Sequence, residues 1–210
     1  MNEEGLINYL LHQNLAKHSK FLECFARTGE WLTKDFLKIS NNITCMEIEP
    51  KYIQKLKENF QNGKILNVDS VHYIDNISDR FDVISMDNPQ GVYGAGYCEH
   101  FEILDKVHKV MKSKCFLIFN INIKPFDVNK TSGNVTTNDN YGSDYNEWMN
   151  RRRRYYNSQD ENTSIDFFAK YYTNFFTEKG FRVSDIRFFM IKSSVEGLDD
   201  NLARCVVKIS

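Results

Sequence analysis

The sequence lacks any apolar run that approaches the roughly 18 residues of a membrane-spanning helix. Its N-terminal segment also lacks the positively charged stretch followed by an apolar core that defines a secretion signal. We therefore expect a protein that is neither secreted nor inserted into a membrane, and we place it in the cytoplasm.

An excess of charge of one sign is also absent. The chain has 27 Lys and Arg against 28 Asp and Glu, which gives a formal net charge of −1. No global field attracts nucleic acid or an anionic membrane, so any contact with nucleic acid needs a local basic patch.

The five cysteines include no C-x-x-C pair and no spacing typical of metal ligands. Cys98 and His100 are close in sequence, but a Cys-x-His pair without distant partners does not indicate a metal site. We expect reduced, buried thiols and no metal.

What the sequence does contain is enough apolar material for one α/β domain, since 41% of its 210 residues are hydrophobic. Short apolar runs alternate with segments of helical spacing along the first 121 residues. The expected strands are 20–26, 43–48, 64–68, 81–86 and 115–121, and the expected helices are 31–39, 50–60 and 99–111. This alternation predicts a parallel sheet with helices on both faces.

The two ends of the chain add further elements. An N-terminal helix is expected over 3–18, and a late helix is expected to start at a cap on Thr163 or Ser164 and to end at Gly180. The runs 181–192 and 202–209 have no helix between them, so they should pair as an antiparallel hairpin.

The segment 124–160 departs from this pattern because it is polar and has no apolar periodicity. A polar loop of this length in a compact domain is usually functional or disordered, and we interpret it as a lid on the acceptor side. It contains the run Arg151 to Arg154, which is followed by two tyrosines and could hold phosphates or remain a solvated face.

Acidic residues follow the expected strands at their carboxyl ends. Glu47, Asp69 and Asp87 stand there, as do all three prolines. In open α/β sheets ligands bind at this edge, so these residues are candidates for a site, although caps and turns are the alternative interpretation.

Four motifs occur in order: E-C-F-A-R-T-G from Glu23, C-M-E-I-E-P from Cys45, N-V-D-S from Asn67 and F-D-V-I-S-M-D-N-P-Q-G from Phe81. Together they resemble the successive motifs of the class I S-adenosylmethionine (SAM)-dependent methyltransferases. The resemblance implies a Rossmann-like sheet of seven strands in the order 3-2-1-4-5-7-6, with strand 7 antiparallel.

The resemblance also implies how SAM is held. Glu23 and Gly29 match the loop under the methionine part, Glu47 matches the carboxylate that accepts from both ribose hydroxyls, and Asp69 matches the acceptor for the adenine amino group. Phe25 and Arg27 stand where the family commonly has glycine. The residues assigned to the cofactor are Glu23, Phe25, Gly29, Glu47, Ile48, Asp69, Ser70 and Asp87.

The run Asp87 to Gln90 resembles the acceptor motif of nitrogen-directed nucleic-acid methyltransferases. Asp87 would orient or deprotonate the acceptor, and His100 could act as a general base. The usual second proline and aromatic are replaced by other residues. Acceptor contacts are therefore assigned to Asn88, Pro89, Gln90, Tyr93 and Tyr97.

The sequence thus predicts a SAM-dependent methyltransferase whose acceptor is unassigned, with an amino group on nucleic acid favoured over the alternatives. The alternatives are a small-molecule N- or O-methyltransferase and a cofactor-binding but inactive partner subunit. A dinucleotide-dependent dehydrogenase is a more distant alternative, because the sequence has no G-x-G-x-x-G.

Overall fold

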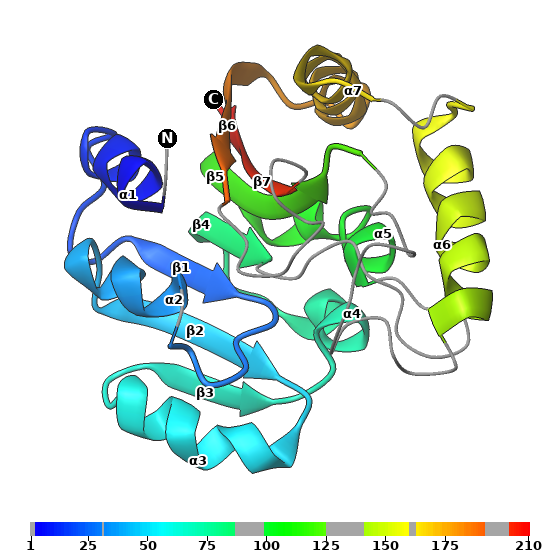
Figure 1. Cartoon of the computed structure of the whole chain (residues 1–210). Coiled ribbons are helices and arrows are strands. Elements are labelled where there is room, and N and C mark those ends of the chain that lie inside the picture. Colours follow the sequence, from blue (N-terminus) through cyan, green and yellow to red (C-terminus); the bar gives the residue numbers. More distant parts are fainter. Residues whose placement is uncertain (1–2, 31, 87–98, 125–140, 160–162, 192–201) are drawn as a thin grey trace.

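The structure is a computed structural model that describes residues 3–30, 32–86, 99–124, 141–159, 163–191 and 202–210 (Figure 1). It is built on one seven-stranded sheet. The strands are β1 (Lys20–Glu23), β2 (Asn42–Glu47), β3 (Lys64–Asn67), β4 (Phe81–Met86), β5 (Met111–Asn122), β6 (Val183–Met190) and β7 (Leu202–Ile209).

The strand order is β3-β2-β1-β4-β5-β7-β6. Strands β1 to β5 pair in parallel, whereas β7 lies antiparallel to both β5 and β6. This confirms the predicted Rossmann-like topology, including the terminal hairpin.

Helices lie on both faces of the sheet, as expected (Figure 1). They are α1 (Glu3–Leu11), α2 (Leu32–Asp35), α3 (Pro50–Asn59), α4 (Ser70–Tyr73), α5 (Glu99–Ile103), α6 (Tyr141–Tyr156) and α7 (Ile165–Glu178). Short 3-10 segments follow three of them, at Phe36–Lys38, Ile74–Asn76 and Val107–Val110. Within the described part of the chain, no helix is long and apolar enough to cross a membrane.

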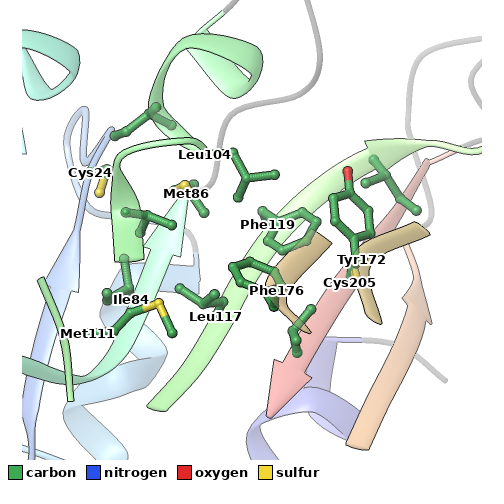
Figure 2. Close-up of a cluster of buried hydrophobic side chains, with 14 of the residues drawn as sticks. Cys24, Ile84, Met86, Leu104, Met111, Leu117, Phe119, Tyr172, Phe176 and Cys205 are labelled. Atoms are coloured by element: carbon green, nitrogen blue, oxygen red, sulfur yellow. The ribbon is translucent and has the colours of Figure 1, made fainter. Parts of the chain in front are cut away.

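Two apolar layers hold the helices to the sheet, because alternate residues of a strand point to opposite faces. One layer includes Ile84 and Leu117 and packs against Tyr172 and Phe176 of α7 (Figure 2). The other layer is formed by Phe21 together with the buried residues of α1, α2 and α3. The core therefore sits on both sides of the strands and leaves their ends for a site.

Four cysteines lie in these layers as buried, unbridged thiols. Burial, the largest cause, and the carboxylate of Glu23 both raise the pKa of Cys24 and of Cys45. Neither thiol is a reactive nucleophile at neutral pH. Cys98 lies outside the described residues.

The residues at the ends of α3 and α7 suit a helix start or stop, and the cap predicted for α7 is confirmed. Pro50 occupies the first turn of α3. Ser164 caps α7 by accepting a hydrogen bond from the Phe167 N–H at 3.1 Å, and Gly180 follows that helix at φ +85°.

Gly63 follows α3, where a left-handed cap would suit a glycine, but the structure has no such cap there. Gly63 has no positive φ, and α3 ends through an N–H of Phe60 that donates to the Leu56 carbonyl. A glycine is found here because a side chain has little room: a Cβ would lie 3.0 Å from the Phe60 Cβ and 3.3 Å from the Ile43 carbonyl oxygen.

Two helices are shorter than predicted. The first ends at Leu11 rather than at residue 18, because Asn14 adopts a left-handed φ of +58° that a helix does not continue through. The segment 99–111 is divided into α5 and a 3-10 turn, and Met111 already belongs to β5.

Helix α6 has no counterpart in the prediction, which interpreted all of 124–160 as irregular. Its inward face presents Met149, Arg152 and Tyr156, all of them buried. A charged residue in the middle of the buried stripe hides the apolar periodicity, so the pattern alone did not indicate a helix. Residues 125–140 lie outside the described residues, and the lid remains a prediction.

Gly29 and Gly180 offer a matched test of packing. Both have positive φ, but a Cβ on Gly29 would lie 2.2 Å from the Phe60 Cε2, whereas a Cβ on Gly180 meets nothing within 4 Å. We expect Gly180→Ala to lower the free energy of unfolding by about 1–2 kcal/mol through backbone strain alone. Gly29→Ala should cost about 1–3 kcal/mol more, because the loop and the Phe60 ring must move apart. Urea denaturation measures both, and equal losses would show that Gly29 is not tightly packed.

Candidate functional site

Two of the three acidic residues predicted at the carboxyl edge, Glu47 and Asp69, lie at neighbouring strand ends together with Glu23. Glu23 ends β1, Glu47 ends β2, and Asp69 follows β3. These strands are adjacent in the order β3-β2-β1, so the three residues border the same part of the carboxyl edge.

Glu47 is buried, and backbone donors fix its carboxylate. Its Oε2 accepts a hydrogen bond from the Arg27 N–H at 2.6 Å, and its Oε1 accepts one from the Glu49 N–H at 2.7 Å. A carboxylate offers about four acceptor positions, so each oxygen still has one for a further donor. The side chain is both an anchor for two loops and a preorganised acceptor.

The backbone beside Glu47 is also fixed. The Asn67 side-chain amide donates to the Glu47 carbonyl at 2.8 Å and to the Ile48 carbonyl at 2.9 Å. The Ile48 side chain remains 54% exposed, which is unusual for a large apolar residue. An apolar surface thus stands next to the Glu47 carboxylate.

Glu23 is fully buried and organises the loop that follows β1. Its two carboxylate oxygens accept hydrogen bonds from the Phe25 N–H and from the Thr33 hydroxyl, both at 3.4 Å. Phe25 is half-buried. Glu23 therefore joins the beginning of this loop, at Phe25, to its end, at Thr33.

Gly29 lies in the same loop at φ +70°, where glycine is strongly preferred. The positive φ agrees with the tight turn that was expected. The space beside Gly29 is filled by Phe60 and Leu56 of α3, so close packing on this helix also requires a glycine. A small hollow of about 10 Å³, bordered by residues 25–30 and Thr33, opens at this loop.

Asp69 caps α4, which was the alternative to its predicted role. Its Oδ1 accepts from the Val71 N–H at 2.9 Å, and its Oδ2 lies 2.6 Å from the His72 Nδ1. The neighbouring Ser70 hydroxyl donates to the Cys24 carbonyl and ties α4 to β1. Whether Asp69 also accepts from adenine stays a prediction.

The arginine run is used in part for internal contacts. Arg151 forms a 2.6 Å ion pair with Glu102. Arg152 is only 3% exposed and donates to the Ile123 carbonyl at 3.2 Å and to the Thr163 hydroxyl at 2.7 Å. It thereby fastens α6 to the end of β5.

Arg153 and Arg154 lie nearer the surface of α6. The Arg153 guanidinium donates to the Asn150 side-chain oxygen at 3.5 Å, and the Arg154 Nε donates to the Asn150 carbonyl at 3.4 Å. Arg154 is exposed, whereas Arg153, like Arg151, is partly buried.

The residues predicted to contact the methyl acceptor belong to a part of the chain that the structure does not describe. Asp87, Asn88, Pro89, Gln90, Tyr93 and Tyr97 lie outside the described residues. His100 belongs to α5, but its side chain is also outside the description. Among the described residues, no group of three or more His, Cys, Asp or Glu could hold a metal ion.

Larger hollows occur at the opposite edge of the sheet. One of about 380 Å³ is bordered by Lys17, Asn42 and Lys64, at the amino ends of the strands. None of the predicted site residues borders this hollow. Its lysines are surface side chains, and Lys20 beside them is paired with Asp79 at 2.6 Å. We therefore locate the site at the carboxyl edge.

Sequence reasoning did not select Asn67 or Thr33 as site residues. Asn67 belongs to the N-V-D-S motif, and a polar residue at the end of a strand is a weak signal for a backbone clamp. Thr33 gave no signal, because its contact with Glu23 exists only in three dimensions.

Comparisons with known proteins support the fold. No family model matches the sequence, and no curated protein matches it. Among solved structures, an rRNA methylase from Streptococcus thermophilus has a TM-score of 0.58 at 7% identity, over 99% of this chain and 96% of that chain.

Two further structures are similar. Precorrin-6y C5,15-methyltransferase from Geobacter metallireducens has a TM-score of 0.52 at 14% identity, over 98% of this chain and 86% of that chain. The methyltransferase SMU.776, complexed with S-adenosylhomocysteine (SAH), has a TM-score of 0.59 at 11% identity. That match covers 98% of this chain and 49% of SMU.776, so this chain spans about half of it.

The chain has the class I methyltransferase fold. Within this fold the order β3-β2-β1-β4-β5-β7-β6 and the acidic edge of β1 and β2 agree with the predicted family resemblance.

The arginine run yields a stability test. Arg152→Ala should lower the free energy of unfolding by about 3 kcal/mol, because the Thr163 hydroxyl and the Ile123 carbonyl each lose a charged donor and packing is lost, although Thr163 still donates to Ile123. Arg154→Ala on the same helix should change it by no more than about 0.5 kcal/mol. Chemical denaturation of both variants checks this. Similar values for the two would contradict a structural role for Arg152.

Proposed function

We propose that this protein is a SAM-dependent methyltransferase. The observation that carries the proposal is Glu47, a carboxylate fixed at the end of β2 with acceptor capacity left over. Two adjacent ribose hydroxyls need an acceptor-only group of this kind. The exposed Ile48 beside it offers an apolar surface suited to a flat heterocycle.

The remaining edge residues fit the same ligand. Glu47 would hold the ribose, Ile48 and Asp69 would border the adenine, and the loop from Phe25 to Gly29 would support the methionine part. Glu23 would act from below by keeping this loop in shape. The similarity to a methyltransferase complexed with SAH supports this assignment at the level of the fold.

SAM supplies a methyl group on a sulfonium, and an acceptor lone pair displaces the sulfur as the acceptor loses a proton. The protein must position the acceptor in line and exclude water, which together account for much of the acceleration in such displacements. Asp87, directly after β4, is proposed to orient the acceptor and to take its proton, and His100 is a second candidate base.

The acceptor is a separate question. Solved methyltransferases of similar fold include one named for rRNA and one named for a precorrin. The nucleic-acid hypothesis depended on Asp87 to Gln90 and on the arginine run. Because Arg152 is buried and Arg151 pairs with Glu102, the hypothesis now depends on Arg153, which is partly buried, and on Arg154, which is exposed.

The role of Glu47 is tested by Glu47→Gln. The amide nitrogen cannot accept a hydrogen bond, so one backbone N–H and one ribose hydroxyl lose a charged partner, each worth roughly 1.5–3 kcal/mol before water compensates. We expect the Kd for SAH in calorimetric titration to rise tenfold or more. Glu49→Gln is the matched control, since Glu49 is exposed and pairs with Lys51, and its Kd should stay within about twofold. Unchanged affinity for Glu47→Gln would refute the ribose site.

Arg153 and Arg154 provide the test of nucleic-acid binding. If they contact phosphates, the double variant Arg153→Ser and Arg154→Ser should bind an RNA oligonucleotide more weakly and flatten the salt slope by about 0.7 per lost contact. Filter binding across a salt series measures this, with SAH binding as the control for folding. Absence of RNA binding by the wild type near 50 mM salt would favour a small-molecule acceptor instead.

A further inference from the structure

Strand β6 ends the sheet and pairs with β7 on one side (Figure 1). In an antiparallel pair, alternate residues turn their backbone N–H and C=O groups toward the neighbouring strand. The Ile191 N–H donates to the Leu202 carbonyl, which fixes the alternation along β6. The residues of β6 that turn their backbone groups away from β7 are Ile186, Phe188 and Met190. Within the described part of the chain, these outward groups accept and donate no hydrogen bond.

The three outward residues also share a face of the sheet. Ile186, Phe188 and Met190 are apolar, and each is partly buried against the core layer that includes α7. They form the margin of this layer, because no described strand lies beyond β6. A further strand beside β6 would continue the apolar layer and would also satisfy the outward backbone groups.

The charges on β6 do little to protect this edge. Edge strands are commonly protected from pairing by free charges or by bulges. The Arg187 Nε donates to both oxygens of Asp185, at 3.1 Å and 2.9 Å, and Asp185 also accepts from the Tyr9 hydroxyl at 3.0 Å. The shift of register against β7 lies at the start of the strand, between Val183 and Asp185. The rest of the edge is therefore regular and carries no net charge.

The order of residues along β6 suits pairing with the same strand of a second copy. An antiparallel pair centred on Phe188 sets Ile186 opposite Met190 of the second copy, so three outward residues of each copy meet. Each of these pairs exchanges two N–H···O bonds. An axis at Arg187 would set two arginines opposite each other, which is destabilising. An axis at Ile186 would bring Ser184, at the irregular start of the strand, opposite Phe188.

We propose that β6 is the docking surface for a second copy of this chain, paired antiparallel about Phe188 so that the two sheets become one. Such a contact is twofold symmetric, uses the same residues from both copies and leaves neither edge open for further growth. The candidate site borders β1, β2 and β3, toward the other end of the sheet, so it stays accessible in the pair. The proposal goes beyond the proposed function and does not depend on it.

Sedimentation velocity at increasing protein concentration tests the pairing, and the wild type should convert from monomer to dimer. Phe188→Pro removes an outward N–H without breaking a bond to β7, so the Kd of the dimer should rise roughly a hundredfold. Phe188→Ala is the matched control, because it loses the same ring but keeps the N–H, and its Kd should rise about fivefold or less. Thermal unfolding confirms that both variants are folded.

Engineered cysteines test the register. Under a mild oxidant Phe188→Cys should form a disulfide between two copies, because Cα atoms of a hydrogen-bonded pair lie about 5.5 Å apart. Arg187→Cys should not, since its counterpart lies diagonally at about 7–8 Å. The wild type under the same oxidant shows whether the native cysteines cross-link.

Three results would overturn the inference. One is a wild type that stays monomeric at every concentration. Another is a dimer that persists in Phe188→Pro and is not cross-linked by Phe188→Cys, because such a dimer uses a different surface. The third is cross-linking of Arg187→Cys in place of Phe188→Cys, which would contradict the register. Binding of SAH is measured separately, so none of these results bears on the proposed function.

Discussion

The carboxylate of Glu47 joins the two loops on which the site depends. It accepts from Arg27 in the loop after β1 and from Glu49 at the start of α3. These two N–H groups lie at neighbouring strand ends, and without a shared acceptor both would need water. The buried Glu47 carboxylate therefore fixes the loops after β1 and β2 relative to each other. The same carboxylate forms the proposed ribose site.

Packing from below reinforces this arrangement. Gly29 lets the first loop lie directly on Phe60 of α3, and Asn67 clamps the backbone at Glu47 and Ile48 from the side of β3. The Glu47 carboxylate, the close packing of Gly29 on Phe60 and the Asn67 amide thus hold the two loops in place. Such preorganisation reduces the entropy lost when a ligand binds.

Much of the fold was predictable because it follows from hydrophobic periodicity. The strands 81–86 and 202–209 appear with the bounds expected, and Ser164 and Gly180 bound α7 as predicted. Helix α6 was missed because the buried Arg152 interrupts its apolar stripe, and a pattern of residue types cannot show that an arginine will be satisfied inside.

For the candidate site, the sequence predicted which strand ends lie side by side, and the roles of the residues there stay predictions. Topology brings Glu23, Glu47 and Asp69 to one edge. The partners of each depend on local geometry, so the cap formed by Asp69 and the contact of Arg27 with Tyr52 could not be deduced from spacing.

The central claim is that a SAM-type cofactor lies across the carboxyl ends of β1 and β2 with its ribose on Glu47. A crystal structure of the protein with SAH tests it most directly. The account predicts both ribose hydroxyls within hydrogen-bond distance of the Glu47 carboxylate and the adenine against Ile48. SAH bound instead in the hollow at the amino edge, beside Lys17 and Asn42, would contradict it.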